Sequence, residues 1–163
     1  MNKIIDVAGY IVKKYQEIAG EKLDELKLHK LLYFTQREAF AVMGEPAFEG
    51  TFEGWKYGPV CKEVRAAFCN GEIIVPVAEI TDEIKYIVNN VITEYGSFAS
   101  WRLMELSHKE TSWQKARVGL SSTENGNQPI LIDDIREDAK KVRPYDHVWD
   151  MYYDEFQTED SPE

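Results

Sequence analysis

Apolar residues in the first quarter of the chain recur at steps of three and four, the spacing that places side chains on one face of an α-helix. Two such stripes stand out. The first predicts a helix that ends at Gly20 and consists of Ile4, Val7, Ala8, Ile11, Tyr15 and Ile18. The second predicts a helix that ends at Gly44 and consists of Leu28, Leu31, Leu32, Thr35, Ala39 and Val42. Further aromatic residues on other faces of the second helix indicate that it is central.

The helical period is lost between residues 45 and 59, where segment 51–55 predicts a short strand between turn residues. Gly58-Pro59 then predicts the start of a third helix, because proline at the first helical position lacks only an N–H that would have no partner. We expect this helix to end at Asn70-Gly71. The β-branched segment 73–80 contains Pro76, which favours an edge strand or an extended connection.

The second half of the chain predicts four more helical stretches. Thr81 provides a side-chain cap for a helix that ends near Tyr95, and shorter helices follow up to His108 and from Thr111 to Val118. Thr111 and Gln114 have the spacing of a capping box. A last helix begins near Asp133, after a solvated loop over residues 120–128. These elements predict a mainly α protein, a compact bundle of about six to seven helices with a minor short β element.

The charge of the chain indicates which kind of partner it binds. The chain has 163 residues, the length of one domain, and a formal net charge of −10. An acidic field repels phosphate backbones and attracts basic proteins, so we expect a protein partner and no nucleic acid. Apolar runs are too short to span a membrane, and Asp6 interrupts the first one, so neither a membrane anchor nor a secretory signal is expected.

Candidate chemistry is sparse. Cys61 and Cys69 are eight residues apart, about 12 Å of helix, which is too far for a disulfide, so free thiols in the cytoplasm are expected. His29, His108 and His147 lack the spacing of a zinc site, and no phosphate loop or nucleophile elbow is present. We therefore expect no metal, no cofactor and no catalytic residue. An activated Cys61 thiolate with His108 is the enzymatic alternative to a buried, inert cysteine.

Three segments carry a resemblance to a known family. Their sequences are LKLHKLLYFTQ at residues 26–36, FEGWKYGPV at residues 52–60 and LSHKETSW at residues 106–113. In order and spacing they resemble the Panacea domain, the family of SocA-like antitoxins and related phage-associated proteins. The resemblance covers roughly residues 6–135, with Cys61 at a position that is often proline in the family.

The resemblance implies an antitoxin of a bacterial or phage type II toxin–antitoxin system, which neutralises by direct binding a protein toxin that is encoded next to it. One branch of the family implies an alternative, a proteolytic adaptor that delivers its toxin to a cytosolic protease unfoldase. An uncharacterised enzyme is the third hypothesis. The domain would span residues 1–142.

The motif residues themselves favour structural roles. We expect Leu28 and Leu31 in the core and interpret Gly58 and Pro59 as the residues that shape the turn. Lys30 and Glu53 would form a paired charge if both are buried. Trp55 and Tyr57 either wedge the turn against the central helix or bind the partner. The remaining structural motif residues are Tyr33, Val60 and Trp113.

Residues 143–163 form an acidic aromatic tail, which we expect to be a docked helix followed by a disordered end. One helical stripe of the tail is aromatic and a second is acidic. The two stripes consist of Tyr145, Val148, Trp149, Tyr152 and Phe156, and of Asp146, Asp150 and Asp154. Either the aromatic face docks onto the domain and the aspartates are solvated, or the tail completes a toxin-binding surface. In the second case Trp149, Tyr152 and the three aspartates bind the partner.

Overall fold

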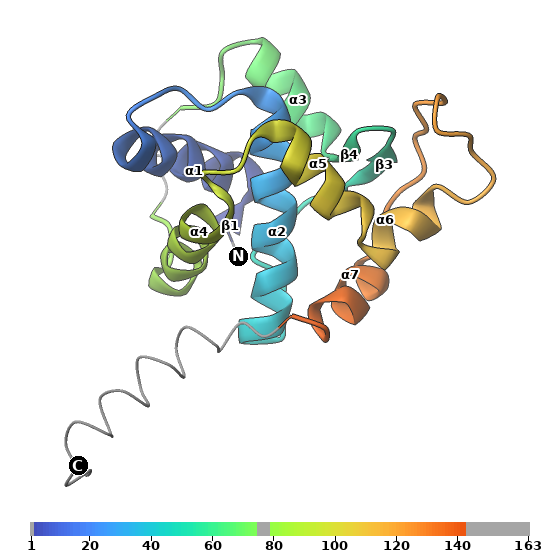
Figure 1. Cartoon of the computed structure of the whole chain (residues 1–163). Helices are drawn as coiled ribbons and strands as arrows, with labels where there is room; N and C mark the ends of the chain where they lie inside the picture. Colours follow the sequence, from blue (N-terminus) through green and yellow to red (C-terminus); the bar gives the residue numbers. More distant parts are fainter. Residues whose placement is uncertain (1, 75–78, 143–163) are drawn as a thin grey trace, which may run out of the picture.

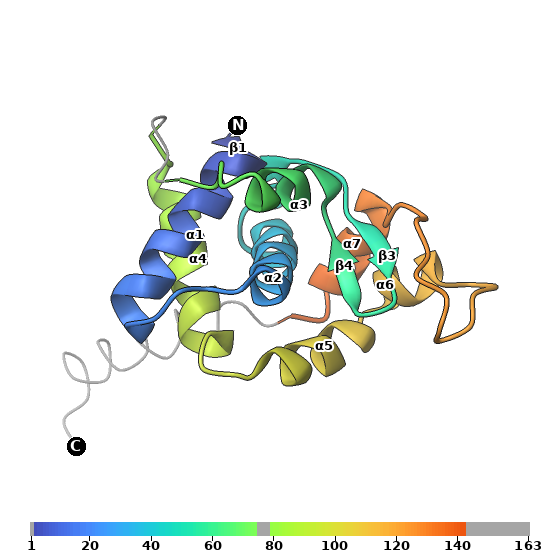
Figure 2. The ribbon, with the colours of Figure 1, turned by 90° about the horizontal axis from the view of Figure 1, so that it is seen from above.

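One buried helix organises the computed structural model, which describes residues 2–74 and 79–142. This helix, α2 (Glu25–Met43), runs through the middle of the domain, and the other helices surround it (Figure 1). Seen from above, α2 lies end-on between α1 (Ile4–Ala19) and α4 (Asp82–Tyr95) on one side and α7 (Ile132–Ala139) on the other (Figure 2). The described residues contain seven helices and two small two-stranded sheets, which confirms the predicted mainly α class.

The two N-terminal helices have the ends that the sequence predicts. Gly20 and Gly44 follow α1 and α2 with φ angles of 74° and 73°, in the left-handed region that glycine adopts at low cost. Asp24 caps α2, since its carboxylate accepts a 2.8 Å hydrogen bond from the N–H of Lys27. Buried residues run around the whole of α2 from Lys27 to Phe40, as expected for a central helix.

The first sheet was not predicted. It pairs β1 (Asn2–Lys3) with β2 (Phe48–Glu49) in parallel. The buried amide of Gln36 supports it from α2: its Nε2 donates to the carbonyl oxygen of Phe48 at 3.1 Å, and its Oε1 accepts from the N–H of Ala47 at 2.8 Å. Two-residue strands carry no periodicity of their own, so the pattern of the sequence could not reveal them.

The second sheet corrects the prediction for Gly58-Pro59. These residues do not start a helix, because β3 (Glu53–Trp55) and β4 (Gly58–Val60) form an antiparallel hairpin with Gly54 opposite Pro59. Proline fits there because β4 is an edge strand, where a missing N–H breaks no ladder. The next helix, α3 (Lys62–Cys69), begins only after Cys61. The other edge of β3 carries an isolated bridge between Glu53 and Pro129.

Thr81 caps α4 as predicted, accepting a hydrogen bond of 3.4 Å from the N–H of Ile84. The short helices α5 (Ser100–His108) and α6 (Thr111–Ala116) follow, and the predicted loop over residues 120–128 is confirmed. The capping box is wrong: Thr111 is already the first residue of α6. Among residues 73–80, the four that the structure describes are in neither a helix nor a strand.

Candidate functional site

The three motif segments meet on one side of α2. Segment 26–36 forms the first half of α2, segment 52–60 forms the β3–β4 hairpin, and segment 106–113 joins α5 to α6. The hairpin and α5 both pack against α2 in the upper half of the domain (Figures 1 and 2). Segments that are far apart in the sequence therefore build one structural unit.

Trp113 joins the third motif to the second. Its indole Nε1 donates a 2.8 Å hydrogen bond to the carbonyl oxygen of Trp55. The ring of His108 stacks on Trp113, with 4.0 Å between the centroids and 8° between the planes. The Ala116 methyl group lies so close to Gly54 that a Cβ atom at position 54 would come within 2.8 Å of it. The hairpin and α6 are therefore in direct contact.

A buried polar network joins the third motif to α2 and α7. Arg37 of α2 forms an ion pair with Glu110 and donates a 2.9 Å hydrogen bond to the hydroxyl of Tyr95. Asp138 of α7, which is 1% exposed, accepts from the N–H groups of Thr111 and Ser112 at 3.1 Å and 2.8 Å. Burial raises the pKa of Glu110, against the opposing effect of Arg37.

Lys30 of α2 packs against the hairpin at Gly58. Its side chain is fully buried, and its Nζ has no hydrogen-bond partner among the described residues. Gly58 lies next to the Lys30 side chain and has a φ of 120°. A Cβ atom at position 58 would come within 2.8 Å of Lys30 Cε and 2.7 Å of Ser107 Oγ. Only glycine therefore fits at position 58. Burial lowers the pKa of Lys30 to about 8.

Lys30 and Glu53, which were predicted to pair only if both are buried, do not pair. Glu53 is only partly buried, and its carboxylate instead lies 3.5 Å from Lys62 Nζ and accepts a 2.9 Å hydrogen bond from the indole of Trp55. Lys30 lies on α2 and Glu53 on β3 of the hairpin itself, and the two side chains contact different neighbours. The sequence could not show this, because the prediction depended on where each side chain points.

Arg117 fixes the loop that follows α6. Its guanidinium donates to the carbonyl oxygen of Gly54 at 3.1 Å, and to those of Ser121 at 2.8 Å and Glu124 at 2.6 Å. It also donates to the carbonyl oxygen of Asn125. A charged fork that satisfies several carbonyl groups holds a loop far more firmly than single neutral hydrogen bonds do. The loop therefore forms a fixed wall beside the hairpin.

A pocket of about 390 Å³ lies between the first turn of α2, the hairpin and this loop. We call it the hairpin pocket. It is lined by Glu25, Leu26, His29, Trp55, Lys56, Tyr57, Val60, Arg65 and Asn125. Tyr57 is 54% exposed and Leu26 is 37% exposed, whereas Val60 and His29 are buried. The pocket thus has a fixed floor and two exposed apolar groups at its rim.

Hydrogen bonds connect the charged residues along one side of the pocket. Glu25 Oε2 accepts from Arg65 Nη1 at 2.8 Å and lies 3.1 Å from His29 Nε2. Arg65 also lies over the ring of Trp55, 5.4 Å from its centroid. Lys56 Nζ lies 5.1 Å from the centroid of Tyr57, and it forms no ion pair with any described residue. The rim therefore carries one cation without a carboxylate partner.

The geometry around Cys61 does not match the enzymatic alternative. The N–H of Cys61 donates to His29 Nδ1 at 3.5 Å, so the neighbouring histidine is His29, while His108 stacks on Trp113. Burial raises the pKa of the Cys61 thiol, which disfavours the thiolate. Burial also lowers the pKa of His29. Both cysteines are free thiols, with Cys61 buried and Cys69 exposed.

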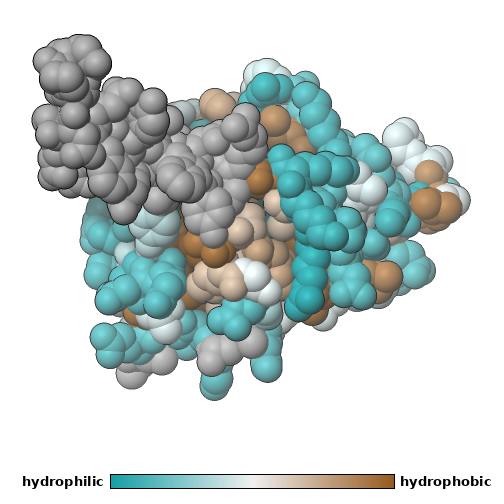
Figure 3. All heavy atoms as spheres, turned by 90° about the horizontal axis from the view of Figure 1, so that it is seen from below, coloured by the Kyte–Doolittle hydropathy of each residue, from teal (hydrophilic) through white to brown (hydrophobic). Residues whose placement is uncertain are grey.

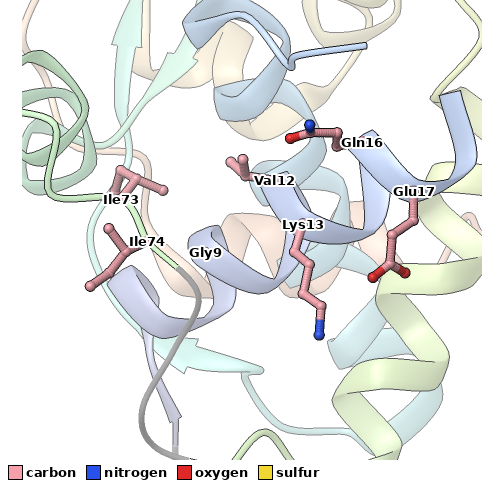
Figure 4. Close-up of a pocket in the computed structure, with 7 residues that line it drawn as sticks. All are labelled: Gly9, Val12, Lys13, Gln16, Glu17, Ile73 and Ile74. Carbon is pink, nitrogen blue, oxygen red and sulfur yellow. The ribbon is translucent and has the colours of Figure 1, made fainter. Parts of the chain in front are cut away.

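Two further hollows have different chemistry. One, of about 510 Å³, lies where Ile73 and Ile74 approach Val12 of α1 (Figure 4). Another, of about 570 Å³, lies at the lower end of α2 and is lined by Met43, Ile84, Glu45 and Glu83 among others. Figure 3 shows the lower face, where apolar atoms gather in the middle and polar atoms surround them. Glu45 and Glu83 make the lower hollow acidic, in contrast to the hairpin pocket.

The structure places the predicted site residues in two groups. Leu28, Lys30, Leu31, Tyr33, Gly58, Pro59 and Val60 are buried, and Trp113 is partly buried. Trp55 and Tyr57 line the hairpin pocket. The tail residues Asp146, Trp149, Asp150, Tyr152 and Asp154 lie outside the described residues.

Four residues were not predicted from the sequence. Lys56 and Arg65 line the hairpin pocket. Arg117 and Asp138 hold the elements around it. Lys56 could have been identified from the sequence, because it is the one cation inside the second motif. The other three depend on contacts between distant segments, for which the sequence carries no local signal.

No group of residues that could hold a metal ion occurs within residues 2–74 and 79–142. In the same ranges, every helix is too short or too polar to cross a bilayer.

Fold and site together define a single-core, mainly helical domain built on a central helix and a Gly-Pro hairpin that three motifs hold in place. The family model of the SocA-like antitoxins, the Panacea domain, matches residues 28–114, which is more than half of the chain. The protein belongs to this family, and the resemblance seen in the motifs is confirmed.

A curated relative supports the same assignment over a shorter stretch. The antitoxin SocA of Caulobacter vibrioides is 37% identical over 71 residues, which are 43% of this chain and 31% of that protein. The chain thus aligns with less than a third of the length of this relative. No solved structure matches the chain.

Proposed function

We propose that this protein is a cytoplasmic antitoxin that neutralises a cognate protein toxin by direct binding, and that the toxin is encoded next to it. Membership of the SocA-like antitoxin family is the observation that carries the proposal. The relative that shares 37% identity over 71 residues is itself an antitoxin. The buried motif residues support the proposal, because they give the domain a fixed frame from which other residues can contact a partner.

Charge supports a partner that is basic overall. Residues 143–163 contain seven of the 29 acidic residues of the chain and one of its 19 basic residues, so the tail carries −6 of the net charge of −10. Such a field accelerates encounters with a basic protein at low salt. We propose that the tail completes the toxin-binding surface, with its aspartates facing cationic groups of the toxin.

Co-expression tests the proposal. The product of the neighbouring reading frame is induced alone and together with the full chain, and growth and the amount of that product are both measured. We expect arrest of growth in the first case and normal growth at an unchanged amount of toxin in the second. Loss of the toxin that depends on this chain would indicate a proteolytic adaptor instead. A neighbouring product that does not arrest growth, or that does not bind this chain, would contradict the proposal.

A further inference from the structure

We propose that the hairpin pocket binds a segment of the toxin that presents an apolar side chain next to a carboxylate. This inference rests on the proposed antitoxin function and names the surface and the chemistry of the contact. Its starting point is the exposure of Tyr57 and Leu26, which are 54% and 37% exposed at the rim of a pocket of about 390 Å³. A tyrosine with this exposure, beside the buried residues Val60 and His29, is the kind of residue that carries binding energy in protein interfaces.

Buried side chains and hydrogen bonds hold the walls of the pocket in place. Its floor is Val60 of the hairpin and His29 of α2, which are 5% and 1% exposed. Trp113 holds the hairpin through the carbonyl oxygen of Trp55, and Arg117 holds the loop that contributes Asn125. A pocket whose walls are already ordered loses little conformational entropy when a partner binds, so more of the contact energy appears as affinity.

The charges of the pocket select the occupant. Its lining contains two cations, Lys56 and Arg65, and one carboxylate, Glu25. That carboxylate already contacts both Arg65 and His29. The Lys56 ammonium lies over the ring of Tyr57 and forms no ion pair with any described residue, so its charge is available to a partner. An occupant with a carboxylate beside its apolar group would pair with Lys56, whereas a basic occupant would be repelled.

The positive charge of the hairpin pocket is local, since the other hollows do not share it. The hollow at the lower end of α2 has two carboxylates and no cation in its lining, and the one beside α1 has Lys13 and Glu17, which balance. A fourth hollow, beside β1 and Cys61, has three carboxylates and two lysines. Of these four, the hairpin pocket alone has a net positive lining, on a chain whose net charge is −10. The toxin would thus contact a cationic pocket here and the acidic surface elsewhere.

Affinity measurements with the purified product of the neighbouring reading frame test the inference. Tyr57→Ser removes the rim aromatic and Lys56→Glu reverses the free charge, both in the full chain. We expect each variant to weaken binding at least about tenfold, with the effect of Lys56→Glu larger at low salt. Trp101→Ser and Lys109→Glu are the matched controls, since both residues are exposed and lie outside the pocket. We expect the controls to stay within about twofold of the parent chain.

The outcomes separate the inference from the proposed function. If the parent chain does not bind the toxin, the antitoxin proposal fails and the inference fails with it. If the parent chain binds and folded Tyr57→Ser and Lys56→Glu variants bind equally well, only the pocket is excluded. Tighter binding by Lys56→Glu would show a basic occupant and overturn the stated chemistry.

Two other occupants are tested with the same variants. A synthetic peptide of residues 143–163 is added to the chain truncated after Val142, provided that this truncated chain shows a cooperative thermal transition. Binding of the peptide that Tyr57→Ser abolishes would assign the pocket to the tail. A dimer of the full chain that Tyr57→Ser dissociates, seen by sedimentation, would assign it to a second copy. Either result overturns the inference, and absence of both, with weakened toxin binding, supports it.

Discussion

The indole Nε1 of Trp113 donates a 2.8 Å hydrogen bond to the carbonyl oxygen of Trp55, and this contact fixes the β3–β4 hairpin to α6. The bond connects the second and third motifs through two tryptophans that are 58 residues apart in the chain. It gives the tryptophan of the third motif a structural role although it does not line the hairpin pocket. The stability of the hairpin therefore depends on a residue of another element.

Trp113→Phe tests this contact. Phenylalanine keeps an aromatic ring against His108 but leaves the carbonyl group of Trp55 without its donor, so we expect a loss of about 1–2 kcal/mol in the free energy of unfolding. Urea denaturation measures it. The same substitution at Trp101, which is 61% exposed, is the control and should change stability by less than about 0.5 kcal/mol. Equal effects at the two positions would show that the hydrogen bond contributes nothing specific.

Asp138→Ala tests the support of α6 by α7. The Asp138 carboxylate is 1% exposed and accepts hydrogen bonds from two N–H groups at the start of α6. Its removal leaves one buried and one partly buried donor without a partner, so we expect a loss of about 2–4 kcal/mol in the free energy of unfolding. Thermal and urea unfolding measure the loss.

The control for Asp138→Ala is Asp134→Ala, on the same helix. Asp134 lies 3.2 Å from Lys115 in a pair whose lysine is largely exposed, and such a pair should contribute less than about 1 kcal/mol. If Asp138→Ala is no more destabilising than Asp134→Ala, the cap on α6 is not important for stability.

The helices could be predicted from the sequence because their apolar residues repeat over several turns and their ends carry glycine or a capping side chain. α1, α2 and α4 follow this rule, with Gly20, Gly44 and Thr81 at their boundaries. The hairpin could not be predicted, since Gly58-Pro59 is as typical of a helix start as of an edge strand. What decides between the two is the pairing of Pro59 with Gly54, a contact that local propensity does not contain.

The site was predictable only in part, for a related reason. Trp55 and Tyr57 were candidates because they lie within a recognisable motif. Arg65 was not, because its role comes from contacts with Glu25 and Trp55 in other elements. The cap on α6 was placed on Thr111, whereas the carboxylate that acts there belongs to Asp138 of α7. In each case the missing information is the position of a distant segment.

Lys30 makes stability depend on pH in a defined direction. Burial lowers its pKa from 10.5 to about 8. Below pH 8 the lysine is charged in both the folded and the unfolded state, and the full cost of burying the charge is present. Between pH 8 and 10.5 the folded protein releases the proton while the unfolded chain retains it, so the free energy of unfolding should rise with pH. The rise due to Lys30 should reach about 3 kcal/mol.

Lys30→Met isolates this effect, since it keeps the shape of the side chain and removes the charge. We expect the variant to be at least as stable as the parent chain at neutral pH, and the difference to shrink as the pH rises above 8. Urea titrations of both proteins at several pH values measure it, and Lys109→Met at an exposed position is the control. If the difference in stability between the two proteins does not change with pH, burial of the Lys30 charge does not destabilise the folded protein.

Deletion of residues 143–163 tests the contribution of the tail to toxin binding. The deletion changes the formal net charge from −10 to −4, because it removes seven acidic residues and one arginine. If the aspartates attract a basic toxin, the association rate at low salt should fall about tenfold, and its dependence on salt should weaken. Stopped-flow measurements over a range of salt concentrations give both quantities.

A full chain with Trp149→Ser and Tyr152→Ser keeps every charge, so it should associate normally and dissociate faster if these aromatics anchor the tail. A truncated chain that stays folded and binds the toxin with unchanged rates and affinity would contradict a role of the tail in binding.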